Sequence, residues 1–183
     1  MAVLTSLESP IGVGWLPVGG SGRLGLTFAP GKKARALNGD RWERDLGADL
    51  DRLVQIHGAQ VLVPLIEDHE LRSLGIDLLV AEAERRGLVV DRLQIRDGGL
   101  PERRAAGDLV ARIGVHLNAG RTVVVHCRGG LGRAGTIGGC TLVSRGVAPE
   151  MALAALRAAR GPGCPENSQQ VGFITSFANT RAQ

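Results

Sequence analysis

A cysteine and an arginine separated by five residues are the part of this sequence best suited to chemistry. Cys127 follows a short apolar stretch, and Arg133 comes after a segment that contains three glycines. A thiolate is a good nucleophile, and the planar guanidinium group of arginine matches two oxygens of a phosphate group. The pair therefore predicts nucleophilic attack on a phosphate ester.

The segment between these two residues is suited to binding an anion. It consists of Arg128, Gly129, Gly130, Leu131 and Gly132. Glycines let successive backbone N–H groups turn inward, and a helix that begins at the arginine adds the positive end of its dipole. The same environment stabilises a thiolate. We expect this loop, residues 127–133, to bind phosphate, and Arg128 to face the rest of the substrate and favour acidic surroundings.

The loop must lie between a strand and a helix to work in this way. The β-branched stretch 122–126 predicts the strand, and 133–144 predicts the helix, which Gly146 ends. Further helices are expected at about 41–57, with Asp40 as N-cap, and at 67–74, 77–86, 102–118, 149–160 and 166–181. Further strands are expected at 61–66 and 88–95. This alternation predicts an α/β fold with a mainly parallel central sheet flanked by helices.

The Gly-rich N-terminal region, residues 11–30, predicts a β-hairpin. Two short apolar stretches, 12–16 and 23–28, flank a Gly-Gly-Ser-Gly sequence at 19–22. Gly20, Gly22 and Gly25 formally match a dinucleotide-binding pattern, but no helical pattern follows, so a turn is expected. With 183 residues, the chain is expected to form a single domain, residues 1–183.

Composition narrows the environment of the protein. The chain is 44% hydrophobic and 22% charged, which is typical of a soluble globular protein, and no apolar run is long enough to cross a bilayer. We therefore expect a cytoplasmic protein without a membrane partner. The three cysteines, Cys127, Cys140 and Cys164, have neither the spacing of a zinc site nor that of a disulfide framework, so no metal or cofactor is expected.

The formal net charge of +4 favours an anionic partner. No long run of like charges indicates a track for a polyanion, so nucleic acid is not the expected partner. The sequence leaves the oligomeric state open. The acidic stretch Glu67-Asp68-His69-Glu70 is expected to cap a helix and not to bind a metal, because adjacent helical positions do not face one another.

The loop and its flanks resemble the signature of a known family. His126-Cys127-x-x-Gly130-x-Gly132-Arg133-x-Gly135-Thr136 is similar to the signature loop of protein tyrosine and dual-specificity phosphatases. Together with Asp97-Gly98-Gly99, it is most similar to the kinase-associated phosphatases, from about residue 28 to 173. The resemblance implies the cysteine phosphatase fold, a phosphocysteine intermediate and phosphorylated proteins or other phosphomonoesters as substrates. It makes His126 and Thr136 supporting residues, of which the histidine orients the loop.

The first half-reaction of such an enzyme needs a proton donor on a separate loop. Asp97 lies 30 residues before Cys127 in a Gly-Gly loop, and the resemblance implies a general acid at this position. Asp91, Glu102 and Asp108 are rivals, but they fall in or beside expected helices and strands, where capping or solvation explains them.

The second half-reaction needs a group that positions water. The resemblance implies a glutamine in the stretch 166–173, which makes Gln170 the candidate. Asn167 stands where threonine is common in the family, so the register is open and Gln169 remains an alternative.

One position departs from the family pattern. Many members carry serine or threonine directly after the arginine, where the hydroxyl stabilises the leaving thiolate, but this chain has Ala134. Thr136 lies two positions further along the helix and should face elsewhere. Loss of such a donor typically slows its step by about 10²–10³-fold, so we expect slow turnover of the phosphocysteine.

Three functions follow from these observations. The first is a phosphatase acting on phosphotyrosine and phosphoserine or phosphothreonine proteins, with a shallow pocket because aromatic residues make up only 3% of the chain. The second is a phosphatase of RNA 5′ phosphates or another soluble polyanion, which the basic charge permits. The third is a phosphoprotein-binding module with weak turnover, suggested by Ala134.

Overall fold

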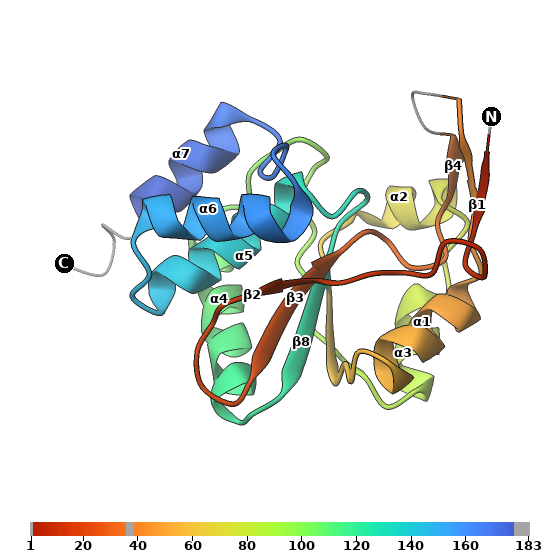
Figure 1. The fold of residues 1–183 in the computed structure, drawn as a ribbon, viewed down its shortest axis with the longest axis horizontal. Helices are drawn as coiled ribbons and strands as arrows, with labels where there is room; N and C mark the ends of the chain where they lie inside the picture. Colours follow the sequence, from red (N-terminus) through yellow and green to blue (C-terminus); the bar gives the residue numbers. More distant parts are fainter. Residues whose placement is uncertain (1, 36–38, 178–183) are drawn as a thin grey trace.

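The computed structural model describes residues 2–35 and 39–177. At its centre is a five-stranded sheet of order β2-β3-β8-β6-β7 (Figure 1). The strands are β2 (Gly14–Leu16), β3 (Arg23–Thr27), β6 (Val61–Pro64), β7 (Val89–Val90) and β8 (Thr122–His126). All neighbours pair in parallel except β2, which is antiparallel to β3. The prediction of a mainly parallel α/β sheet with an N-terminal hairpin is confirmed.

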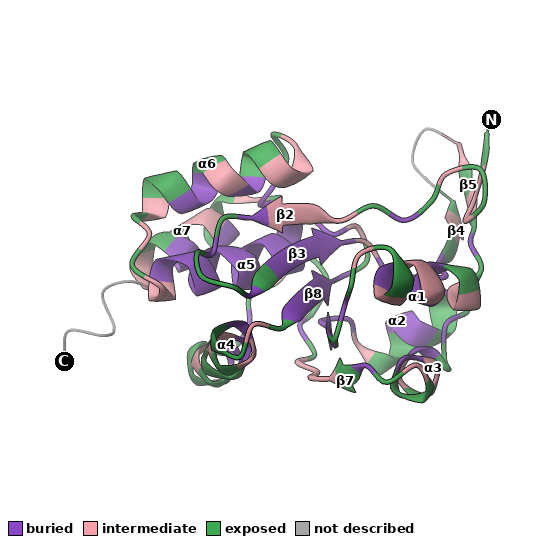
Figure 2. Ribbon diagram, turned by 60° about the horizontal axis from the view of Figure 1, so that its bottom comes forward, coloured by how far each residue is buried: buried purple, intermediate pink, exposed green. Residues whose placement is uncertain are grey.

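Helices lie on both sides of this sheet (Figure 1). They are α1 (Leu46–Gln55), α2 (Asp68–Ser73), α3 (Leu79–Arg85), α4 (Arg103–Asn118), α5 (Gly132–Ser144), α6 (Pro149–Arg160) and α7 (Ser168–Phe177). Every residue of β6 and β8 is buried, as expected for parallel strands covered on both faces (Figure 2).

Helix α5 is the central helix of the fold. Its residues from Gly132 to Val143 are all buried. Glycines let neighbouring elements approach closely: a Cβ atom on Gly138 would lie 2.9 Å from Leu16, and one on Gly139 would lie 2.6 Å from Ile174. The helix that follows the predicted phosphate loop is therefore held tightly between the sheet and α7.

A second, three-stranded sheet lies at the edge of the molecule near the N-terminus (Figure 1). It consists of β1 (Val3–Thr5), β4 (Lys33–Arg35) and β5 (Arg41–Glu43). Strand β5 pairs in parallel with β1 and antiparallel with β4. This sheet was not predicted, since each strand has only three residues and none is fully buried.

The helix expected at 41–57 was wrong at its start. Residues 41–43 form β5, and α1 begins at Leu46 after Asp45, whose side chain accepts a hydrogen bond of 2.7 Å from the Ala48 N–H group. Asp45, and not Asp40, is therefore the N-cap. Trp42 lies four residues before Leu46 and so imitates helical spacing, but its ring packs against Phe28 with 5.2 Å between centroids.

The strand expected at 88–95 was too long, because only Val89 and Val90 form β7. The residues after it still follow the central sheet: the N–H groups of Asp91, Leu93 and Ile95 donate to the carbonyls of residues 62, 64 and 65. This extended segment leads the chain to Asp97. The last helix begins at Ser168, and the end expected at 181 lies outside the described residues.

Candidate active site

The loop that follows β8 places Cys127 at the edge of the central sheet. Cys127 is only 3% exposed, and its sulfur accepts a hydrogen bond of 3.2 Å from the Gly130 N–H group. Gly130 has φ +76°, and a Cβ atom there would lie 2.5 Å from the backbone of Thr27. Glycine is therefore required at this position, both by the left-handed backbone and by the close approach of β3.

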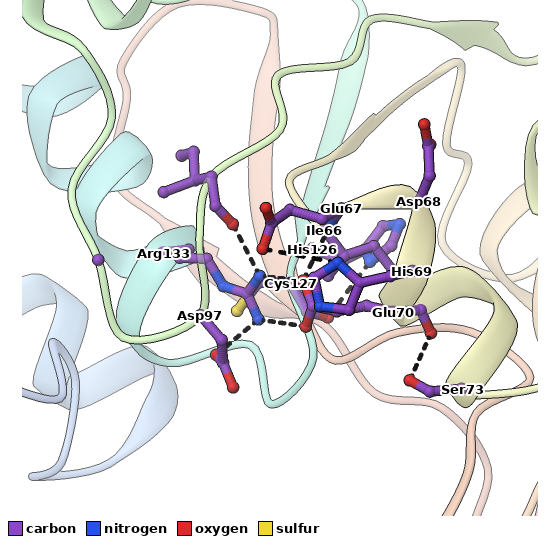
Figure 3. Close-up of polar contacts among 12 residues, drawn as sticks. Ile66, Glu67, Asp68, His69, Glu70, Ser73, Asp97, His126, Cys127 and Arg133 are labelled. Atoms are coloured by element: carbon purple, nitrogen blue, oxygen red, sulfur yellow. Dashed lines mark hydrogen bonds and ion pairs between the residues drawn. The ribbon is translucent and has the colours of Figure 1, made fainter.

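Arg133 lies in the first turn of α5, and its side chain is buried. Its Nη1 donates to Glu70 Oε2 at 2.6 Å, and its Nη2 donates to Glu70 Oε1 at 2.9 Å (Figure 3). Nη1 also donates to the Ile95 carbonyl at 3.0 Å. Burial alone would lower the pKa of Arg133, but the hydrogen bonds with Glu70 raise it. The guanidinium group is thus fixed in one plane and stays charged.

Asp97 contacts the same guanidinium group from the other side (Figure 3). Its Oδ1 accepts a hydrogen bond of 2.7 Å from Arg133 Nη2, and its side chain is 57% exposed. The structure therefore brings the aspartate expected as general acid next to the arginine expected to bind phosphate.

Glu70 is a site residue that the sequence analysis missed. The stretch 67–70 does form a capping box, as expected for a helix-capping turn, with the Glu67 N–H group donating to Glu70 Oε2 at 3.0 Å. Glu70 also makes the paired contact with Arg133, which lies 63 residues away. Burial would raise the pKa of Glu70, but Arg133 and the Glu67 N–H group lower it. The signal that could have identified Glu70 is its position just after β6, because the end of this strand lies at the same sheet edge as Cys127.

His126 is the last residue of β8 and is completely buried. Its Nδ1 donates to the Cys127 carbonyl at 3.3 Å, and its Nε2 has no partner among the described residues. Burial lowers the pKa of His126 to about 4, so the ring is neutral at pH 7. A neutral ring that holds the backbone of Cys127 suits a supporting role.

The two candidate glutamines occupy different environments. Gln170 is buried beside the loop, since a Cβ atom on Gly132 would lie 2.8 Å from Gln170 Nε2, whereas Gln169 is exposed. Gln170 Oε1 accepts a hydrogen bond of 3.0 Å from the Glu166 N–H group. Of the two, only Gln170 lies against the loop.

The glutamine segment is also joined to the segment that carries Asp97. Asn167 Oδ1 accepts a hydrogen bond of 2.9 Å from the Gln170 N–H group and so caps α7. Asn167 Nδ2 donates to the Gly98 carbonyl at 3.1 Å, and Gln170 Nε2 donates to the Gly99 carbonyl at 3.4 Å. Asparagine thus has a structural role at the position where the family commonly has threonine.

Neither Ala134 nor Thr136 supplies a hydroxyl group to the Cys127 sulfur. Ala134 is buried and has no hydroxyl group, and Thr136 Oγ1 donates to the Gly132 carbonyl at 2.8 Å, within α5. The Thr136 hydroxyl is therefore engaged in its own helix, four residues back.

Two further residues contact the loop and were not foreseen. Arg160, at the end of α6, donates from Nε to the Gly130 carbonyl at 3.0 Å and from Nη2 to the Gly129 carbonyl at 3.2 Å. Glu166 lies at the rim, where its carboxylate forms a hydrogen bond with the backbone of Gly132. Burial and the nearby Asp97 raise the pKa of Glu166. Both residues therefore bind the backbone of the loop, Arg160 through its carbonyls and Glu166 at Gly132.

A cleft of about 430 Å³ opens in front of the loop. Cys127, Asp97, Glu166 and the exposed Arg128 line one part of it. A parallel sheet that carries a cysteine, a glycine-rich loop and an arginine at one edge, with an aspartate reaching in from a separate segment, defines a cysteine-dependent phosphatase.

Comparison with known proteins gives the family. The family Tc-R-P, described as "Polymorphic toxin system, DSP-PTPase phosphatase", matches residues 43–147, and the chain belongs to it. The protein is thus a phosphatase of the dual-specificity and protein tyrosine class.

Individual relatives agree with this assignment. The chain is 28% identical over 180 residues to cyclin-dependent kinase inhibitor 3 of Rattus norvegicus, covering 96% of this chain and 82% of the relative. A crystal structure of kinase-associated phosphatase, with serine in place of its catalytic cysteine, is similar with a TM-score of 0.86 and 26% identity, covering 96% of this chain and 99% of the other. The active form of Tk-PTP gives a TM-score of 0.68 and 26% identity, covering 91% and 97%.

Within the described residues, no helix has the length and apolar character needed to cross a membrane.

Proposed function

We propose that this protein hydrolyses phosphotyrosine and phosphoserine or phosphothreonine in proteins through a phosphocysteine formed on Cys127. The observation that carries the proposal is the buried guanidinium group of Arg133, which Glu70 holds in a fixed plane and which contacts Asp97, a residue that lines the same cleft as Cys127. A fixed, charged fork is what the recognition of two phosphate oxygens requires. The names of the relatives, a kinase inhibitor and a kinase-associated phosphatase, favour a phosphoprotein as substrate.

In the first step, the Cys127 thiolate attacks phosphorus, the S–P bond forms and the bond to the leaving oxygen breaks. The loop amides and Arg133 bind the non-bridging oxygens. Asp97 donates its proton to the leaving oxygen. Its contact with Arg133 at 2.7 Å supports this role, because it places the carboxyl group beside the group that binds the phosphate.

In the second step, water attacks the phosphocysteine, the S–P bond breaks and the thiolate leaves. Gln170 positions this water, and Asp97, now ionised, accepts its proton. The buried position of Gln170 beside Gly132 supports the assignment to it, in preference to the exposed Gln169.

A cytoplasmic location belongs to the same proposal. The three described cysteines are all free thiols. Free thiols, one of them a nucleophile, suit the reducing conditions of the cytoplasm.

A second candidate function is a phosphoprotein-binding module with weak turnover. It is favoured by the absence of a hydroxyl group at Ala134 and by the engagement of the Thr136 hydroxyl with the Gly132 carbonyl. In such a module, the phosphocysteine would form but would hydrolyse slowly.

Rapid-mixing hydrolysis of p-nitrophenyl phosphate, with a chelator present, tests both candidates. We expect turnover by the wild-type protein and none by Cys127→Ser. Gln170→Ala should slow the steady state, whereas its neighbour Gln169→Ala should not. If the wild-type protein releases no phosphate while Cys127→Ser binds phosphopeptides, the binding module is the correct function.

A further inference from the structure

The second sheet forms the far wall of the active-site cleft. Trp42 on β5 and Arg35 on β4 line the same cavity as Cys127, together with Lys32, which immediately precedes β4. Figure 1 shows this sheet at the edge of the molecule, beyond the end of the central sheet. The sheet does not pair with the strands that carry the catalytic loop. Its position at the cleft is therefore suited to substrate recognition.

Lys32 is the most unusual residue of this wall. It is 7% exposed, and its Nζ lies 3.9 Å from the centre of the Trp42 ring and 4.7 Å from the centre of the Phe28 ring. The Nζ also donates to the Arg128 carbonyl at 3.4 Å. The two rings and this carbonyl hold the ammonium group in place beside the loop.

No carboxylate of the described residues forms an ion pair with Lys32. Most of its charged neighbours are cations. Burial, together with the positive charges of Arg44 and Arg128, lowers the pKa of Lys32 to about 8, and Cys127 has a smaller effect in the opposite direction. The nearby carboxylate of Asp49 is already paired with Arg44 at 2.8 Å. A buried ammonium group that forms no ion pair with a carboxylate gains from an anion that arrives with a ligand.

The phosphate being cleaved has its own binding groups. The Gly130 N–H group points toward the Cys127 sulfur, whereas the loop carbonyls of Gly129 and Gly130 bind Arg160. Because Lys32 Nζ lies at the Arg128 carbonyl, it is outside the cradle formed by the loop amides and Arg133. Two exposed cations, Arg35 and Arg128, line the same cleft as Lys32.

We propose that Lys32 binds a second anionic group of the substrate. The preferred substrates are then phosphoproteins in which an acidic side chain or a second phosphorylated residue lies next to the phosphorylated residue. The inference rests on the proposed function, since it assigns the substrate class of the same site. Trp42 and Phe28 have the role of holding Lys32 in position.

Binding to the Cys127→Ser protein tests this without relying on turnover. Calorimetry would compare two phosphotyrosine peptides that are identical except for glutamate or glutamine at the positions flanking the phosphotyrosine. A charge-assisted hydrogen bond predicts about tenfold tighter binding of the glutamate peptide. Adding Lys32→Met should bring the ratio of the two affinities close to one, and Lys32→Arg should retain part of it.

Lys33→Met is the matched control. Lys33 is the adjacent lysine, is exposed and does not line the cleft, so its loss should leave the ratio unchanged. Urea unfolding of each variant shows that the fold is retained. If Lys32→Met weakens both peptides equally, or leaves the ratio at its original value, Lys32 does not bind a second anion and the inference is wrong.

The result is separable from the enzymatic proposal. Charge selectivity in Cys127→Ser, combined with no turnover by the wild-type protein, would keep Lys32 as a recognition residue and reject the hydrolase. Turnover without charge selectivity would support the hydrolase and reject Lys32 as a recognition residue.

Discussion

Asp97 and Glu70 both accept hydrogen bonds from the same guanidinium nitrogen of Arg133. Arg133 Nη2 lies 2.7 Å from Asp97 Oδ1 and 2.9 Å from Glu70 Oε1. Glu70 is buried and holds the guanidinium group, whereas Asp97 is exposed and can leave. In the proposed mechanism, a bound phosphate takes the place of Asp97 at this nitrogen, and the aspartate is then free to reach the leaving oxygen.

Replacing this carboxylate should separate binding from catalysis. We expect Asp97→Asn to lower kcat for a phosphotyrosine peptide by about 10²–10³-fold, since general acid catalysis typically contributes this much. The loss for p-nitrophenyl phosphate should be smaller, because its leaving group needs less protonation. Inorganic phosphate should inhibit the variant more strongly, because the Asp97 carboxyl group no longer competes with phosphate for Arg133. Steady-state kinetics with phosphate as inhibitor measures all three effects.

Asp108→Asn is the control for this change, because Asp108 is an exposed carboxylate on α4. It should leave kcat and phosphate inhibition unaltered. An Asp97→Asn enzyme with wild-type kcat on the peptide would show that another group is the acid.

Restoring a hydroxyl group after the arginine should speed the second step. In Ala134→Ser, the new oxygen supplies the donor to the leaving thiolate that this chain lacks. We expect a burst of p-nitrophenol in the wild-type protein and, in the variant, a smaller burst with a steady-state rate about 10–10²-fold higher. Rapid-mixing absorbance measures both phases.

Thr136→Val provides the comparison. The Thr136 hydroxyl donates to the Gly132 carbonyl, so its removal should not change the ratio of burst to steady-state rate. A wild-type protein without a burst would place the slow step before the phosphocysteine, contrary to this expectation.

Two adjacent glycines should respond differently to alanine. Gly130 has φ +76° and meets the Thr27 backbone, whereas Gly129 has ordinary φ and would place a Cβ atom no closer than 4.0 Å, to Glu166. Gly130→Ala should lower the free energy of unfolding by about 1–2 kcal/mol or more through backbone strain and should reduce kcat strongly. Gly129→Ala should be nearly neutral in urea unfolding. If Gly130→Ala and Gly129→Ala changed the free energy of unfolding equally, the loop would be able to accommodate a side chain at either position, contrary to this prediction.

Burial of His126 should appear in the pH dependence of stability. The pKa of this ring is about 4 in the folded protein, against 6.5 for an ordinary histidine. Below pH 6.5 the unfolded chain takes up a proton that the folded chain does not, so this group lowers the free energy of unfolding by up to about 1.4 kcal/mol per pH unit down to about pH 4. Urea unfolding between pH 7 and 4 should show a shallower slope in His126→Gln.

Direct titration checks the same point without a variant. The ring resonances of His126 in NMR spectra should not shift between pH 7 and 5. A midpoint near 6.5 for His126 would contradict the buried, neutral ring.

The lowered pKa of Glu70 affects stability in a different pH range. Its contribution to the free energy of unfolding is complete above pH 4.5 and is lost only as the pH falls further.

The parts of the site that are local in sequence could be predicted. Strand, loop and helix around Cys127 follow one another directly, so the order of residue types sufficed. Asp97 could be predicted as a candidate because glycines mark its turn. The contacts of Glu70 and Arg160 could not be predicted, since they join residues 63 and 30 positions apart through the packing of α2 and α6. Neither residue stands out by type from the other charged residues.

The choice between Gln169 and Gln170 had to wait for the structure for a similar reason. Neighbouring residues at a helix start point in different directions, and only the exact start of α7 after Asn167 determines which of them is buried. The second sheet was missed because its short strands obtain their order from pairing between residues 3 and 41 and between 33 and 43, which no local pattern encodes.

The hydrogen bonds from Asn167 and Gln170 to the carbonyls of Gly98 and Gly99 have a consequence for motion. The segment of Asp97, the proposed proton donor, and the segment of Gln170, the proposed water-positioning residue, share these two links, so they should move together when a substrate enters or leaves. Asn167→Ala would remove one of the two links and leave the other, so the two segments would move together less closely.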